Sequence, residues 1–139
     1  MHIIDGRNPY HVNEVTSTPQ RPDWCNYFLA IAEVVASRAS CLRAKVGAVI
    51  VAPDHSVISI GYNGAPSGEI SCLEAGCLME DNHCQRCLHA EVNAVAWTSR
   101  HGTVIPEGSM IYIWSNRGDK EPCRECRKVL TAVRLPWIL

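Results

Sequence analysis

His89-Ala90-Glu91, read with Pro122-Cys123-Arg124-Glu125-Cys126 further along the chain, is the stretch around which this sequence must fold. One imidazole and two thiols are ligands that zinc accepts, and a carboxylate two residues after the histidine can act as an acid or base beside the metal. A catalytic zinc site keeps its fourth position open for water. His-x-Glu followed by Pro-Cys-x-x-Cys is a recognised pattern for such a site. We therefore predict a zinc centre with the ligands His89, Cys123 and Cys126, and Glu91 as its proton shuttle.

The spacing of these residues predicts where they lie. We expect His89 to begin one helix, and Cys123 and Cys126 to lie on the first turn of another. Helix N-termini carry partial positive charge and free N–H groups, which stabilise thiolates. Glu91 is too close to His89 to ligate the same tetrahedral ion comfortably. The alternative is a structural zinc, which would need a fourth protein ligand and would have no use for Glu91.

Length and composition narrow the class of protein. A chain of 139 residues with 47% hydrophobic and 19% charged residues is typical of one globular domain. A net charge of −1 and a pI near 6.6 argue against a nucleic-acid binder, which needs a basic face. No apolar run reaches the ~20 residues of a membrane span, and the N-terminus lacks a signal-peptide pattern. We expect a cytoplasmic protein whose eight cysteines are reduced and favour metal over disulfides.

The first part of the chain predicts an arm, a helix and a hairpin. Residues 1–20 are polar and without periodicity, so we predict an N-terminal arm, either a flexible extension or an oligomer contact, ahead of one domain over 21–139. Apolar residues at three- and four-residue spacing predict a helix from Pro22 to about Ser40, and Asp23 can cap it. The stripe is Trp24, Phe28, Ile31 and Val35; a strand over 46–51, a turn over 53–55 and a strand over 57–61 follow.

Later elements are predicted in the same way. We interpret the glycines of the loop over 61–68 as allowing positive φ and close approach of the backbone to a ligand. We predict that the cysteine-rich segment 70–88 has no regular secondary structure. The remaining elements are a helix over 89–99 with Val92, Val95, Ala96 and Ser99 at helical spacing, a strand over 110–114, a helix over 123–133 and a last strand over 137–139. This order favours an α/β fold in which helices cover a mixed sheet.

Several segments together resemble one family. The sequence is similar to the zinc-dependent cytidine deaminase superfamily, and within it to its deoxycytidylate (dCMP) deaminase branch. The loop Gly-Tyr-Asn-Gly-x-Pro, together with His-Ala-Glu-x-Asn-Ala, narrows the resemblance from the superfamily to this branch. The matching segments lie between residue 24 and about 133: Arg-Ala-Lys-Val-Gly-Ala-Val-Ile-Val, Gly-Tyr-Asn-Gly-Ala-Pro-Ser-Gly, Cys-Leu-Glu-Ala-Gly-Cys-Leu, His-Ala-Glu-Val-Asn-Ala-Val and Pro-Cys-x-x-Cys.

The resemblance implies a fold and a reaction. The fold is a three-layer α/β sandwich, a mixed sheet with helices on both faces. The reaction is hydrolytic deamination of dCMP to dUMP and ammonia, which feeds thymidylate synthesis, with Glu91 passing a proton to the base and then to the amine. It also implies that the backbone N–H of Ala90 holds the base carbonyl and that Asn63 binds the deoxyribose. For the phosphate we nominate Arg43 and Lys45, which could equally be solvated surface charges.

The remaining cysteines exceed what one zinc ion can use. Some members of the resembled family carry a second, structural zinc, whose ligands correspond to Cys41, Cys72 and Cys87 here. The fourth ligand would be His83, with Cys84 as the alternative because Cys84-x-x-Cys87 has chelate spacing. The other reading is a group of reduced packing cysteines.

The resemblance also implies regulation. In the resembled enzymes the glycine loop lines an allosteric pocket at a subunit interface, where dCTP with Mg²⁺ activates and dTTP inhibits. We therefore expect a homohexamer with nucleotide feedback. The corresponding positions are Gly61, Tyr62, Asn63, Gly64, Trp97 and Arg100, the last two with the alternative of a core aromatic and an exposed helix end.

Two features depart from the family pattern. Residues 115–121 lengthen a linker that is usually very short, and they carry Arg117 and Lys120, which either contact substrate phosphate or belong to a surface loop. The sequence ends at Leu139, where the resembled proteins continue into another strand and helix. Two other functions compete. A deaminase of tRNA adenosine would show more basic surface, and a zinc-stabilised binding module or inactive regulator would not need Glu91.

Overall fold

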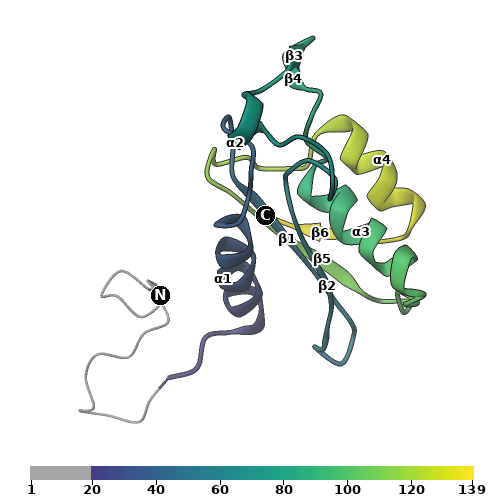
Figure 1. Ribbon diagram of the computed structural model, residues 1–139. Helices are drawn as coiled ribbons and strands as arrows, with labels where there is room; N and C mark the ends of the chain where they lie inside the picture. The colour runs from purple at the N-terminus through teal and green to yellow at the C-terminus, as the bar shows by residue number, and fades with distance from the viewer. Residues whose placement is uncertain (1–19) are drawn as a thin grey trace.

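The structure, a computed structural model, describes residues 20–139 and is built on a four-stranded mixed sheet with the strand order β2-β1-β5-β6 (Figure 1). The strands β1 (Val46–Val51), β2 (Val57–Tyr62) and β5 (Met110–Ser115) pair antiparallel, and β6 (Trp137–Ile138) runs parallel to β5. The predicted strands are confirmed. The predicted arm, residues 1–20, lies outside the described residues except for Gln20.

Helix α1 (Trp24–Ala36) covers one face of the sheet. Asp23 caps it, because its Oδ1 accepts a hydrogen bond of 2.7 Å from the backbone N–H of Asn26. Phe28 and Val35 of the predicted stripe are buried against Val49, Val51 and Tyr112, but Trp24 is 49% exposed and stacks on His55. The helix ends at Ala36, four residues before the predicted end.

Helices α3 (Ala90–His101) and α4 (Arg124–Ala132) cover the opposite face (Figure 1), so the predicted three-layer sandwich is confirmed. Gly102 ends α3 in the left-handed conformation, with φ 65°. Of the residues named at helical spacing, Val92 and Val95 are half-buried, whereas Ala96 and Ser99 are exposed. The buried face of α3 consists of Ala90, Glu91, Ala94 and Thr98. Alanines at positions 90 and 94 allow the helix to pack closely on the sheet.

Two glycines let these helices approach the sheet. A Cβ on Gly61 of β2 would lie 2.5 Å from the Ala90 carbonyl oxygen, and one on Gly47 of β1 would collide with the Ala32 carbonyl oxygen of α1. The close neighbour of Gly61 is therefore helix α3, not a ligand, and its φ is not positive. Among the glycines predicted in that loop, Gly68 alone has a positive φ.

Residues 70–88, predicted to be irregular, contain a short helix and a small hairpin. Helix α2 (Cys72–Ala75) begins with a capping box between Ser71 and Glu74. The strands β3 (Met79–Glu80) and β4 (His83–Cys84) pair antiparallel around a turn with positive φ at Asp81 and Asn82. This segment lies next to the N-terminal end of α3 (Figure 1). Within residues 20–139, no helix has the length and apolar character needed to cross a membrane.

Candidate active site

The residues of the opening motif meet at the N-termini of α3 and α4. His89 is the N-cap of α3 and Cys123 the N-cap of α4, so each helix begins one residue after its predicted start, and Cys126 follows in the first turn of α4. His89 Nδ1 lies 3.2 Å from the sulfur of Cys126 and 3.3 Å from that of Cys123. A nitrogen and a sulfur that share a tetrahedral zinc ion are about 3.5 Å apart. The spacing fits zinc.

The loop before α3 holds His89 in place. Gly64 and Leu88 exchange two backbone hydrogen bonds, of 3.1 and 2.9 Å, immediately before the histidine. The Asn93 side chain, one turn into the helix, donates to the carbonyl of Tyr62 at 2.8 Å. The glycine loop therefore positions the start of the catalytic helix.

Glu91 is buried beside the two thiols. It is 5% exposed, although it lines a cavity of about 320 Å³ that also receives His89 and Cys123. Burial raises the pKa of the Cys126 thiol, and the Glu91 carboxylate and Cys123 raise it further. Groups that ionise to negative charge are thus packed together, which a bound cation would compensate. No fourth His, Cys, Asp or Glu in residues 20–139 joins this three-residue group, so a tetrahedral ion would keep a free position.

The predicted substrate contacts have different locations. Ala90 lines the cavity as the first residue of α3, where a backbone N–H has no partner within the helix. Asn63 also lines it, but the Asn63 side chain accepts from Val46 N–H and donates to Ala44 C=O, both at 2.8 Å. One N–H of its amide is left for a ligand.

Only one of the two nominated cations lies at the cavity. Arg43 lines it, and its guanidinium donates to the Asn82 carbonyl at 2.9 Å. Lys45 does not line it; its ammonium donates to the Ala39 carbonyl at 3.3 Å, so the structure does not support Lys45 as a phosphate ligand. Arg117, from the lengthened segment 115–121, lines the cavity instead. Its place in an insertion next to Pro-Cys-x-x-Cys was the signal for it in the sequence.

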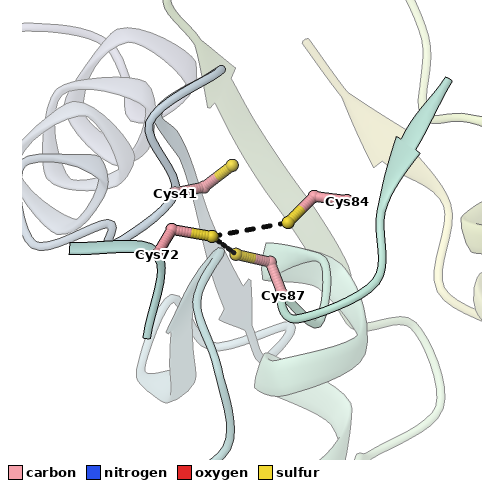
Figure 2. A group of neighbouring side chains, drawn as sticks. All are labelled: Cys41, Cys72, Cys84 and Cys87. Carbon is pink, nitrogen blue, oxygen red and sulfur yellow. Dashed lines mark hydrogen bonds between the residues drawn. The ribbon is translucent and has the colours of Figure 1, made fainter. Parts of the chain in front are cut away.

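Four other cysteines gather in a second group, which Figure 2 shows with the side chains directed toward one another. The sulfur of Cys72 lies 3.4 Å from that of Cys84 and 3.5 Å from that of Cys87, and the four sulfurs lie within 4.8 Å of one another. Sulfurs around a tetrahedral zinc ion are about 3.8 Å apart. The fourth member is Cys84 and not His83, which corrects the first choice from the sequence. His83 is exposed and lines the cavity.

Cys72, Cys84 and Cys87 of this group differ in acidity. Burial raises the pKa of Cys72 to about 12, and burial also raises that of Cys87. Burial acts in the same direction on Cys84, but hydrogen bonds from the backbone of Arg86, the Cys72 thiol and further backbone groups outweigh it and lower its pKa to about 6. Backbone N–H groups thus already favour the thiolate at Cys84. All eight cysteines are free.

The residues predicted to be regulatory do not form one surface group. Gly61, Asn63 and Gly64 are buried, and Asn63 lines the catalytic cavity. Tyr62 is 38% exposed at the end of edge strand β2. Trp97 is 51% exposed on α3, and the Arg100 guanidinium carbon lies 5.9 Å from the centre of its ring. The reading of Trp97 as a core aromatic is therefore wrong.

Comparison with known proteins gives a consistent result. Residues 22–138 match the family described as the cytidine and deoxycytidylate deaminase zinc-binding region. The ComE operon protein 2 of Bacillus subtilis (strain 168) is 41% identical over 109 residues, which are 78% of this chain and 54% of that protein. The deoxycytidylate deaminase of Mycobacterium phage D29 is 37% identical over 123 residues, which are 81% of this chain and 89% of that protein. The chain thus spans about half of the first relative and most of the second.

A solved structure shares the architecture. The dCMP deaminase of cyanophage S-TIM5, in complex with dCMP and dUMP, superposes with a TM-score of 0.66 at 29% sequence identity. The superposition covers 84% of this chain and 79% of that one.

Proposed function

The chain belongs to the cytidine and deoxycytidylate deaminase family, and on this premise we propose that it converts dCMP and water to dUMP and ammonia. The observation that carries the proposal is the meeting of His89, Cys123 and Cys126 beside the buried Glu91 at one cavity. A purely structural zinc would give the buried Glu91 carboxylate, on the open side of the site, no chemical role. The dCMP and dUMP bound to the cyanophage enzyme support a free nucleotide as the substrate.

The donor set fits zinc, which His89, Cys123 and Cys126 would hold. When bound, zinc would supply Lewis acidity that makes water a nucleophile near neutral pH. Glu91 would take the proton of the attacking water, deliver it to N3 of the base and assist the departure of the 4-amino group as ammonia. Its burial keeps bulk water from competing for these protons.

Backbone and amide groups would orient the base and sugar. The N–H of Ala90 at the start of α3 would donate to the base carbonyl, aided by the positive end of the helix. Asn63 would offer its remaining N–H to the deoxyribose while its other contacts fix the side chain. An amide held by two backbone bonds loses little further freedom when a ligand binds.

One assay tests this function against its competitors. Ammonia release is measured from dCMP, dCTP, deoxycytidine and a structured RNA, each with and without prior removal of metal by a chelator. We expect release from dCMP, abolished by the chelator and restored by zinc. Release from the RNA alone would favour a polynucleotide deaminase. Zinc binding without any release would favour a binding module.

We also propose a second, structural zinc held by Cys41, Cys72, Cys84 and Cys87. Four sulfurs that converge from three segments, at residues 41, 72 and 84–87, support it (Figure 2), and so does the lowered pKa of Cys84. Eight free cysteines also agree with a reducing, cytoplasmic location. Metal analysis should give two zinc ions per chain. A value near one would return these thiols to the reading of packing cysteines.

We propose the regulation that the family resemblance implies, with the regulatory positions limited to the exposed ones. The chain would form a homohexamer, activated by dCTP with Mg²⁺ and inhibited by dTTP, with the exposed Tyr62, Trp97 and Arg100 at the regulatory surface. An arginine beside an exposed tryptophan can contact both the phosphates and the base of a nucleotide. Sigmoidal dCMP kinetics that become hyperbolic with dCTP are expected, together with a hexamer by light scattering. Hyperbolic kinetics unchanged by either nucleotide would contradict it.

A further inference from the structure

Two guanidinium groups line the catalytic cavity and have different environments. Arg43 and Arg117 are the lining residues with a Lys or Arg side chain among residues 20–139. Arg43 comes from the segment before β1 and already donates to the Asn82 carbonyl. The guanidinium of Arg117 has neither a hydrogen-bond nor an ion-pair partner within the described part of the chain. A negatively charged group of a ligand could therefore bind Arg117 without displacing an existing contact.

The backbone around Arg117 is fixed, although its side chain is free. Asn116 N–H donates to the Lys45 carbonyl and Lys45 N–H donates to Asn116 Oδ1, both at 3.0 Å. The Arg117 N–H donates to Ser115 Oγ at 3.2 Å, and Gly118 completes the turn with φ 71°. These bonds continue the pairing of β1 with β5 beyond the strands. Binding a ligand would then require the ordering of one side chain and not of a whole loop.

The acidic residues near Arg117 are engaged elsewhere. Asp119 also lines the cavity, but its carboxylate accepts a hydrogen bond of 2.6 Å from the Ser115 hydroxyl. Glu121 lines it too and forms an ion pair of 3.2 Å with Arg127. Neither carboxylate forms an ion pair with Arg117. The positive charge of Arg117 therefore remains available to an anion.

We propose that Arg117, within segment 115–121, binds the 5′-phosphate of the nucleotide and so selects nucleotides over nucleosides. The inference rests on the proposed deaminase function. A guanidinium binds phosphate through two parallel hydrogen bonds, which a lysine ammonium cannot reproduce. The cavity has a volume of about 320 Å³, within the usual range for small-molecule sites. Glu91 and Arg117 both line it. Arg117 is thus a binding residue for the group of the substrate that does not react.

The test compares two neighbouring cations of one loop. Arg117→Ala is expected to lower kcat/KM for dCMP by roughly 10- to 100-fold, mainly through KM, because a charge-assisted contact is lost. Deamination of deoxycytidine, which has no phosphate, should change less than about twofold. Lys120→Ala, in the same loop but not on the cavity, is the matched control and should leave both substrates unaffected. Arg117→Lys should restore part of the affinity.

A second measurement covers the case of slow turnover on deoxycytidine. Calorimetry with dUMP and deoxyuridine should show that Arg117→Ala weakens binding of the nucleotide alone. If Arg117→Ala behaves like Lys120→Ala while the unaltered protein deaminates dCMP, the inference about Arg117 is wrong. If the unaltered protein releases no ammonia from dCMP, the proposed function itself fails. An equal loss for dCMP and deoxycytidine would assign Arg117 a structural role and also overturn the proposal.

Discussion

The two cysteine-containing groups of this protein differ in how the fold presents them. His89, Cys123 and Cys126 lie at the N-termini of two helices that pack on the sheet, and they leave one side open to a cavity. The second group joins four cysteines from loops and short elements, with Cys72 1% exposed. Three donors on rigid helices are suited to catalysis, and four donors on otherwise weakly held segments are suited to holding those segments together.

Residues of both cysteine-containing groups also line the same cavity. Cys41, Cys84 and Cys87 line the same cavity as Glu91, and Cys87 precedes His89 by two residues. The hairpin of β3 and β4 has few buried apolar side chains of its own, so the second group and the hydrogen bond from Arg43 to the Asn82 carbonyl attach it to the domain. A metal there would keep one side of the substrate cavity in place without taking part in the reaction.

The largest expected effect separates chemistry from metal binding at the first group. Glu91→Gln keeps the size of the side chain and removes its ability to accept a proton. We expect kcat to fall on the order of 10²- to 10⁴-fold, with the zinc content unchanged. Steady-state kinetics and metal analysis of the same preparation check this. Near-normal turnover would mean that Glu91 is not the proton shuttle.

An intermediate effect is expected at the second group. Cys84→Ser should reduce the zinc content from two ions to one per chain and lower the melting temperature. The loss of metal affinity should exceed the roughly 10- to 100-fold cost of losing an outer-shell partner. His83→Ala is the matched control from the adjacent position and should keep both ions. If His83→Ala lost the second zinc ion and Cys84→Ser kept it, His83 would be the ligand instead.

The smallest expected effect concerns the position of helix α3 on the sheet. Gly61→Ala and Gly47→Ala place a methyl group against α3 and α1, respectively, on opposite faces of one sheet. Each should cost about 1–3 kcal/mol of unfolding free energy through overpacking. Below the melting transition, Gly61→Ala alone should reduce kcat, because α3 carries His89 and Glu91. Equal kinetics for the two variants would show that the position of α3 tolerates this displacement.

The features that were predictable from the sequence are local ones. Asp23 at the start of α1 and Gly102 at the end of α3 act through neighbouring backbone groups, so their roles follow from sequence spacing. The predictions that failed concern neighbours across the fold. Ala94 is buried and Ala96 exposed on the same helix, and Lys45, one of the two cations nominated for the phosphate, lies off the cavity. The spacing of apolar residues predicted the buried face of α1, where Phe28 and Val35 contact the sheet, but α3 has no comparable stripe of large apolar residues.

His89-Ala90-Glu91 and Pro-Cys-x-x-Cys by themselves determined the type of centre, because ligand chemistry and the spacing within one helical turn are properties of short segments. The fourth member of the second group was decided only by tertiary structure. His83 and Cys84 are consecutive in β4, and successive side chains of a strand leave it in opposite directions. The register of β4 with β3, with Met79 opposite Cys84, sets which of the two reaches Cys41 and Cys72. That choice depends on contacts of Cys84 with Cys72, 12 residues away, and with Cys41, in a segment before β1, which the immediate sequence around residues 83 and 84 does not encode.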